Sequence, residues 1–491
     1  MLRTRLVVAA LVPVAALALA ASASAATARM EEMDIPEGGT LPVLRYTAAP
    51  GEANRVALDV AADGGSVTVG DLGAVITAGE GCSSVTAGLV RCVVPAGQAL
   101  ESFVVKLGDG DDGAGGTSAA PVGGEFDGGA GMDVLDTTGF GVGWPMMLRG
   151  GGGDDTLTGG ATGEDLFGGG GSDRLSGGPG DDRLDGSGEL AAGRDVEDAA
   201  PRGDVLDGGP GRDAAQWSHR GVRLRLDLQD PLHAGAEGEN DQLLGIEDLQ
   251  GGQAPDTIAG DAGDNSIVGG LDSSNRMSGR GGNDVLVGVG RLSGGAGDDR
   301  LTGGGRLLGG EGEDFLATPI GGTSNGGPGS DEIRTGHAHA VTCGGGTDLL
   351  ALRHALGPVG SPSLGSPIGP FMRDRCARID VIGFRLDNLR SSTTRVRARA
   401  ERSLPTACSA FAEVRSVRGR RVGRVLGRVH WRWSASGRKR LSIRLDAAGR
   451  RAARRRAVVV MRTGSYLRCP RGRPPGSLRY VANLRFRLTN H

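Results

Sequence analysis

The sequence has few aromatic residues and almost no lysine. Phe, Trp and Tyr make up only 3% of the 491 residues, whereas a wide globular core normally relies on aromatic side chains for buried area. This shortage favours thin architectures with narrow cores. Lysine occurs only at Lys106 and Lys439, so arginine supplies nearly all of the 55 basic residues. That bias is typical of GC-rich genomes and gives no information about the mechanism of the protein.

The sequence motifs of common hydrolases are either absent or lack the surrounding residues that catalysis requires. None of the seven histidines belongs to an HExxH motif, which a zinc protease would need. Residues 322–326 match GxSxG, but a nucleophile elbow requires a strand–turn–helix context that the sequence does not predict there. His337 and His339 form an HxH pair without an evident third metal ligand, so we interpret them as turn residues. We therefore expect no enzymatic activity.

The N-terminus has the pattern of a secretory signal peptide over residues 1–26. Arg3 and Arg5 precede the apolar run Leu6–Ala20, and Ala23–Ala25 supplies small residues for cleavage. A membrane anchor is the alternative, but the apolar run is short for a span. The sequence thus predicts a secreted or cell-surface protein without a membrane span after cleavage.

The six cysteines are expected to form disulfides, because exported proteins reach an oxidising compartment. Their spacing favours local pairing, although six cysteines allow other connectivities. A structural zinc site is the alternative, but no CxxC pair is present. The predicted pairs are Cys82–Cys92, Cys343–Cys376 and Cys408–Cys469.

Glycine is the abundant residue, with 91 copies, and it dominates a repetitive region at residues 106–350. Four nonapeptides run in one frame from Gly150 to Asp185: GGGGDDTLT, GGATGEDLF, GGGGSDRLS and GGPGDDRLD. Each carries a leucine at the same position, which a disordered Gly/Asp linker would not need. The spacing therefore predicts a regular solenoid in which two nonapeptides make one 18-residue coil.

The copies around residues 275–316 follow a longer period. Asp284, Asp299 and Asp314 are 15 residues apart, and two apolar columns share that period. We predict a 15-residue coil with one GGxGxD turn and one tighter turn, so that these three aspartates stack on one edge. The two apolar columns are Leu286, Leu301 and Leu316, and Met277, Leu292 and Leu307.

The GGxGxD turn has the composition of a calcium ligand set. Glycine permits the positive φ values of a tight turn with inward carbonyl groups, and the aspartate adds a carboxylate. Calcium takes six to eight oxygen ligands, more than one turn offers, so two stacked turns would share each ion. Asp155 would lie over Asp173, and Glu164 over Asp182. The ion row would be double in the 18-residue coils and single in the 15-residue coils.

This repeat resembles the RTX nonapeptide family, whose signature binds calcium in a parallel β-helix. The resemblance covers roughly half of the chain, and the whole chain is similar to calcium-binding repeat proteins exported by actinobacteria. Imperfect copies make Asp112 and Asp348 weaker candidates. Without a cation the stacked carboxylates would repel, so we expect calcium binding to be coupled to folding. The resemblance implies these ligands: Asp133, Asp155, Asp173, Asp182, Asp213, Asp284, Asp299, Asp314 and Asp331.

Composition divides the rest of the chain, which we predict to be all-β. Residues 27–105 alternate apolar and polar positions and predict a short N-terminal β region. Residues 106–350 form the calcium-binding β-solenoid, and residues 351–384 a loop and cap that contains Cys376. Residues 385–491 predict a β-sandwich, with 29 basic and 4 acidic side chains.

The sequence of the basic C-terminal region does not decide between several possible partners. A solvated arginine face is one interpretation, and binding to anionic cell-envelope polymers is another. Nucleic acid is not an expected partner of an exported protein. We expect a secreted calcium-binding repeat protein; an envelope-binding adhesin or scaffold is the alternative, and an RTX-associated hydrolase is less favoured.

Overall fold

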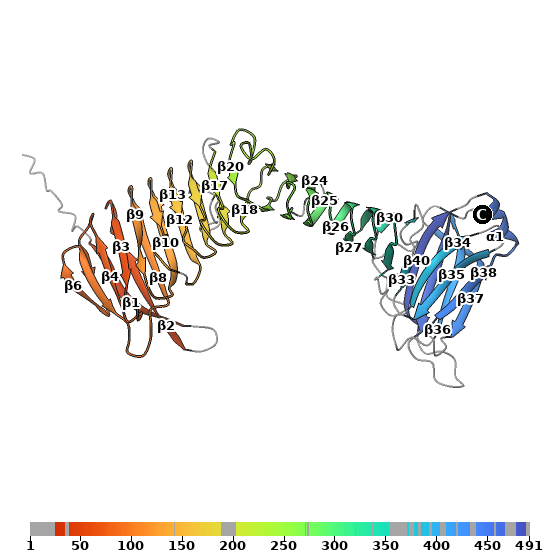
Figure 1. Ribbon diagram of the computed structural model, residues 1–491, viewed down its shortest axis with the longest axis horizontal. Helices are drawn as coiled ribbons and strands as arrows, with labels where there is room; N and C mark the ends of the chain where they lie inside the picture. Colours follow the sequence, from red (N-terminus) through yellow and green to blue (C-terminus); the bar gives the residue numbers. More distant parts are fainter. Residues whose placement is uncertain are drawn as a thin grey trace, which may run out of the picture.

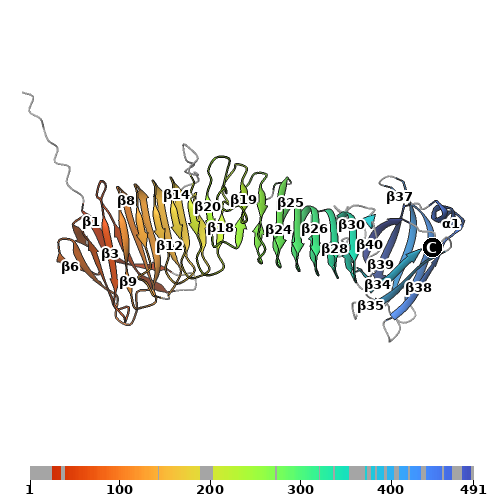
Figure 2. The same cartoon turned by 45° about the horizontal axis from the view of Figure 1, so that its top comes forward.

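The chain forms an elongated β structure (Figures 1 and 2). A parallel solenoid lies between an N-terminal group of strands at one end and a C-terminal β-sandwich at the other. This computed structural model describes residues 25–487 without 35–38, 142, 188–202, 271, 273, 320, 336–337, 353–370, 373–377, 382–383, 392–394, 403–408, 419–420, 433–437, 456–457 and 467–477. The expected signal peptide lies outside the described residues.

The N-terminal strands cover the first coil of the solenoid. Strand β2 pairs in parallel with β8, and β3 pairs in parallel with β9, so the coil stack continues into this region. A disulfide joins Cys82 and Cys92 across the antiparallel pair β6–β7, which confirms the first predicted bridge. The strands are β1 (Ala26–Asp34), β2 (Thr40–Thr47), β3 (Arg55–Val60), β4 (Ser66–Asp71), β5 (Ile76–Ala78), β6 (Cys82–Thr86) and β7 (Leu89–Val93).

The first block of the solenoid has two parallel sheets, and each coil adds a strand to both. Leu157 pairs with Leu175 in one sheet and Leu166 pairs with Leu184 in the other, each 18 residues on, as predicted. One sheet contains β8 (Ser102–Asp109), β10 (Gly123–Ala130), β12 (Met146–Gly152), β14 (Asp165–Gly170), β16 (Arg183–Asp185), β18 (Ala214–Gln216), β21 (Asp248–Gln250) and β23 (Ser266–Val268). The other contains β9 (Gly113–Ser118), β11 (Val134–Asp136), β13 (Thr156–Thr158), β15 (Arg174–Ser176), β17 (Val205–Asp207) and β20 (Gln242–Leu244).

The second block begins after a junction, which we define as residues 247–281. The junction contains the last two strands of the first sheet, β21 and β23, together with β22 (Thr257–Ala259) and β24 (Asn275–Gly281), and β19 (Arg225–Asp227) comes before it. In the second block β25 and β26 pair along their length at a separation of 15 residues, which confirms the predicted short coil. Its strands are β25 (Val285–Ala296), β26 (Arg300–Glu311), β27 (Phe315–Thr318), β28 (Gly322–Pro328), β29 (Glu332–Thr335), β30 (Ala338–Gly345) and β31 (Leu349–Leu352).

The core is a narrow stack of aliphatic side chains, as the shortage of aromatic residues predicts. Each short strand turns one apolar side chain inward, so leucines from successive coils contact each other. Fully buried examples are Leu157, Leu166, Leu175 and Leu184 in the first block and Leu286, Leu292, Leu301, Leu307 and Leu316 in the second.

The C-terminal region is a β-sandwich of two antiparallel sheets, which confirms the predicted fold class. One sheet has the order β33-β34-β35-β38, and the other has the order β37-β36-β39-β40. The elements are β32 (Phe371–Met372), β33 (Arg378–Val381), β34 (Phe384–Ser391), β35 (Arg395–Arg402), β36 (Ser409–Arg418), β37 (Arg421–Arg432), β38 (Arg438–Arg444), α1 (Ala447–Arg454), β39 (Val458–Tyr466) and β40 (Leu478–Arg487).

Among the described residues, no helix has the length and hydropathy to cross a bilayer. Cys343 is disulfide-bonded. Its expected partner Cys376 lies outside the described residues, and so do Cys408 and Cys469. The second and third predicted pairs therefore stay predictions.

Candidate calcium sites

An acidic or amide side chain stands directly before most of the short solenoid strands and links its coil to the preceding coil. The main-chain N–H of Asp133 donates to Oδ1 of Asp155 at 2.8 Å, and the N–H of Asp155 donates to Oδ1 of Asp173 at 2.8 Å. Each such side chain is one rung of a ladder along the solenoid edge. The ladder forms because the preceding turn leaves its last N–H pointing at the next coil.

Most rungs form two rows, while Asp256 and Asn275 form a short run of their own, in which the N–H of Asp256 donates to Oδ1 of Asn275. Row 1 precedes one sheet of the first block and starts where the N–H of Asn54 donates to Asp112. Row 2 precedes the other sheet and continues through the second block. Row 1 consists of Asp112, Asp133, Asp155, Asp173, Asp204 and Asp241. Row 2 consists of Glu164, Asp182, Asp213, Glu247, Asn265, Asp284, Asp299, Asp314, Asp331 and Asp348.

All nine aspartates singled out in the sequence are rungs, and each is at most 2% exposed. Row 1 contains three of them, and Row 2 contains the other six. Asp284, Asp299 and Asp314 stack on one edge, where successive N–H···Oδ1 distances are 2.9 Å. The rungs are thus double in the 18-residue coils and single in the 15-residue coils. The matching rows of calcium ions stay a prediction.

The second carboxylate oxygen of most aspartate rungs is buried and accepts no hydrogen bond. Burying a polar oxygen without a partner costs about 1–3 kcal/mol, so repeated orphans indicate a ligand that the polypeptide alone does not supply. The affected Oδ2 atoms belong to Asp112, Asp133, Asp155, Asp182, Asp213, Asp284, Asp299, Asp314 and Asp331.

Backbone oxygens converge on the same places. A Cβ on Gly150, the first glycine of its turn, would lie 2.2 Å from Oδ2 of Asp155 and 2.6 Å from the carbonyl oxygen of Gly168 on the next coil. In the second block a Cβ on Gly309 would lie 2.1 Å from Oδ2 of Asp314 and 2.5 Å from the carbonyl oxygen of Gly326. Only glycine leaves this space open. Oxygens from two coils thus face one small cradle, which fits the oxygen preference of calcium.

Each cradle has one carboxylate per turn. Within the described part of the chain, no three His, Cys, Asp or Glu side chains gather around a common point. An ion in a cradle would therefore take most of its oxygens from main-chain carbonyl groups. Calcium accepts such mixed ligands in flexible geometry, whereas zinc prefers nitrogen and sulfur ligands.

Burial raises the pKa of many of the rung carboxyl groups. Desolvation is the largest cause, and neighbouring carboxylates add to it. The pKa of Asp155, Asp299 and Asp331 rises to about 7, and that of Asp284 and Asp314 to about 6. The hydrogen bond from the preceding coil lowers the pKa but does not cancel the effect of burial. Near neutral pH these groups are therefore close to their titration range, and a bound cation would favour their ionised form.

An exposed ladder runs beside the buried one. In this ladder the side chain of the residue just before a rung accepts a main-chain N–H from the next coil. For example, Oδ1 of Asp298 accepts the N–H of Glu313 at 2.7 Å. One coil earlier Asn283 has the same role and accepts from Asp298 at 2.8 Å. Because Asn replaces Asp here without loss of the contact, this exposed ladder needs no negative charge.

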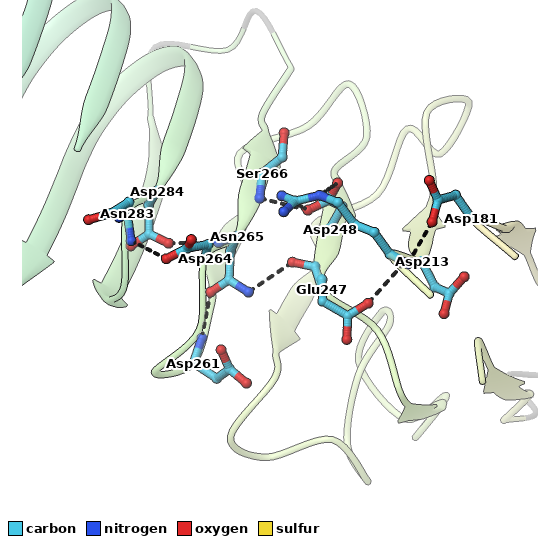
Figure 3. A network of polar contacts seen from close by, with 11 residues as sticks. Asp181, Asp213, Glu247, Asp248, Asp261, Asp264, Asn265, Ser266, Asn283 and Asp284 are labelled. Atoms are coloured by element: carbon cyan, nitrogen blue, oxygen red, sulfur yellow. Dashed lines mark hydrogen bonds and ion pairs between the residues drawn. The ribbon is translucent and has the colours of Figure 1, made fainter. Parts of the chain in front are cut away.

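At the junction, nitrogen donors take the place of the orphaned oxygens. Asn265 lies between Glu247 and Asp284 (Figure 3), and its Nδ2 donates to the Glu247 carbonyl at 2.9 Å. Asn275 likewise donates to the Gly270 carbonyl at 2.9 Å. Oδ1 of Asn275 accepts the N–H of Asp256 from another coil, whereas Oδ1 of Asn265 accepts the N–H of Asp261 in its own turn. Each amide thus satisfies a neighbouring carbonyl without a metal ion.

Arg280 adds a fixed cation to the junction. It occupies the second glycine position of its turn with a φ of 82°, and its guanidinium donates to the Gly260 carbonyl at 2.5 Å. The same group forms a bidentate pair with Asp227, at 2.7 and 2.9 Å. Burial would raise the pKa of Asp227, but the Arg280 hydrogen bond and charge bring it below its usual value.

The sequence alone did not single out several rungs. Asp204 and Asp241 lie outside any complete GGxGxD motif, yet both precede a short strand with an inward leucine. Asp112 and Asp348, the weaker candidates, are each 1% exposed and lie in the ladder. All four share a pattern that needs no preceding glycines: an aspartate followed two residues later by a small or aliphatic residue, which is leucine in three of them.

The comparisons with known proteins agree with this geometry. The family model of the RTX calcium-binding nonapeptide repeat matches four copies, at residues 147–162, 158–189 and 243–274. No curated protein matches the chain. Fold and site together define a parallel β-solenoid, and its turns at the matched residues are similar to the RTX calcium-binding nonapeptide repeat.

Proposed function

We propose that this protein is a secreted, non-catalytic calcium-binding protein, whose solenoid reaches its stable fold when ions occupy the cradles between stacked turns. The RTX repeats and the β-solenoid support calcium as the ligand. One observation carries the proposal: at rung after rung, a buried carboxylate oxygen faces backbone oxygens of the next coil and accepts no hydrogen bond.

Electrostatics supports the coupling to folding. In the metal-free fold, each ionised rung places a charge among buried groups and close to carboxylates of the adjacent coils. A divalent ion between two rungs removes both costs, and the unfolded chain offers no preformed cradle. The free energy of ion binding then adds to the free energy of folding.

The test is a calcium titration of the purified chain, followed by calorimetry and far-ultraviolet circular dichroism together. EDTA should lower the β signal, and millimolar calcium should restore it with heat of binding over the same concentrations. Magnesium at the same concentration is the control, because it favours rigid octahedral sites with retained water. A β signal unchanged by EDTA and calcium, with measurable binding heat, would show binding without coupling; no binding heat would reject the calcium function.

Secretion and the structural role belong to the same proposal. The signal-peptide pattern at residues 1–26 and the Cys82–Cys92 disulfide support export. Fractionation of expressing cells, with the N-terminus of the mature protein sequenced, tests it. The basic C-terminal sandwich remains a candidate for binding anionic cell-envelope polymers, which a salt-dependent pull-down on purified cell walls would check.

A further inference from the structure

Three arginines stack on one face of the solenoid. Arg276 of β24 pairs with Arg291 of β25, and Arg291 pairs with Arg306 of β26, in register and in parallel. All three side chains are exposed. We call them the arginine column. Neighbouring strands lie about 4.8 Å apart, so the column repeats a positive charge at about that spacing along the solenoid axis.

The column is not neutralised by the protein. Other solenoid arginines lie against acidic groups, such as Arg212 with Asp248 and Arg280 with Asp227. No described ion pair involves Arg276, Arg291 or Arg306. Like charges directly opposite on adjacent strands destabilise a sheet. The body before residue 385 carries more acidic than basic residues, so a row of unpaired arginines there calls for an external partner.

The surroundings of the column are polar. Ser278 pairs with Ser293 in the next outward-facing column. Toward β30 the face has a hollow of about 390 Å³ at the end of the arginine column. Its lining consists of Arg306, Leu308, Thr323, Ser324, Asn325, Ala340 and Thr342. Strands β24, β25, β26, β28 and β30 contain no Phe, Tyr or Trp.

We propose that this face binds an extended acidic polysaccharide that lies along the solenoid axis. Guanidinium groups bind carboxylates through paired hydrogen bonds, and the column presents them at regular spacing. Hydroxyl and amide side chains beside the column suit sugar hydroxyl groups. Single-stranded nucleic acid would gain affinity from stacking on Phe, Tyr and Trp side chains, which these strands lack. The inference is separate from calcium binding and requires only the folded solenoid.

The experiment uses the full chain in calcium and measures affinity for oligomers of glucuronic acid, with glucose oligomers of equal length as the neutral counterpart. The wild type should bind the acidic oligomer and not the neutral one. The variant R276Q/R291Q/R306Q should lose about tenfold in affinity, because exposed ion pairs are each weak but three act together. The remaining affinity should fall as salt is raised.

The matched control is R55Q/R174Q/R223Q, which removes the same charge from three exposed arginines elsewhere. It should keep the wild-type affinity. Equal affinities of the two triple variants would place binding elsewhere, the basic C-terminal sandwich included, and overturn the proposal. Tighter binding of oligodeoxythymidylate than of glucuronate would overturn the polymer class. Circular dichroism checks folding, and the single variant R291Q replaces the triple if the triple misfolds, with a smaller loss expected.

Discussion

Replacing Asp299 with Asn distinguishes a calcium ligand from a structural side chain. Oδ1 of Asp299 accepts the N–H of Asp284 at 2.9 Å, and its own N–H donates to Asp314 at 2.9 Å. Asn keeps both bonds and the side-chain volume. The change is confined to Oδ2, which is buried without a partner and would become an uncharged NH₂ group.

The variant should change stability in opposite directions with and without calcium. Extracellular calcium modules bind with Kd values on the order of 0.1–1 mM. For one site at the tight end of that range, about 10 mM free calcium stabilises the fold by about 2.7 kcal/mol. D299N should lose about that amount in calcium. In EDTA above about pH 8 it should be at least as stable as the wild type, because a buried charge is gone.

Chemical denaturation at the two calcium levels measures both effects, and D298N is the matched control. Asp298 is exposed, and Asn283 already fills the equivalent position one coil earlier with the same type of hydrogen bond. D298N should therefore change stability little in either condition. If D299N destabilised the protein equally in EDTA and in calcium, the Asp299 carboxylate would serve packing rather than metal binding, and our reasoning about the ladder would fail.

Three further outcomes follow from the ladder. Gly150→Ala should abolish the adjacent cradle, because its Cβ would lie 2.2 Å from Oδ2 of Asp155. The control is Gly152→Ala in the same turn, whose Cβ would meet nothing within 4 Å. Calorimetry should show a lower calcium stoichiometry for the first variant than for the second. Asn265→Asp should add calcium capacity and cost about 1–3 kcal/mol in EDTA, since the donor to the Glu247 carbonyl is lost; unchanged stoichiometry would contradict it. The raised pKa of the rung carboxyl groups contributes to the stability of the metal-free fold fully below about pH 4, and this contribution is lost as pH rises through about 6–7. Calcium affinity should rise over the same range because ions displace protons, and calorimetry in buffers of different ionisation enthalpy counts those protons.

The coil geometry could be predicted from the sequence because the solenoid uses a local rule. Each coil places one leucine inward and one aspartate at the turn, so residue spacing alone gives the stacking of Asp155 over Asp173 and of Asp284 over Asp299. Glycine spacing fixes the turn because a Cβ would meet the next coil's oxygens. Such contacts between adjacent coils need no knowledge of distant segments.

The rest depended on contacts between residues far apart in sequence. Asp173 accepts the N–H of Asp155 from the preceding coil, but its own N–H donates to Asp204, 31 residues later, and Asp204 in turn donates to Asp241, 37 residues later. Irregular coil lengths hide these rungs from any fixed period. The role of Asn265 could not be predicted either. In the sequence, an amide in place of the carboxylate indicates only an imperfect motif, whereas the structure shows its Nδ2 donating to the Glu247 carbonyl.

The junction makes the two blocks different in their dependence on metal. In the second block each rung from Asp284 to Asp331 leaves a buried oxygen without a partner, so we expect each of these coils to be stabilised by an ion. At the junction, Asn265, Asn275 and Arg280 donate N–H groups to main-chain carbonyls, so those coils carry their own cations or donors. Because a solenoid is stabilised coil by coil, loss of calcium should melt the second block while the junction keeps its hydrogen bonds.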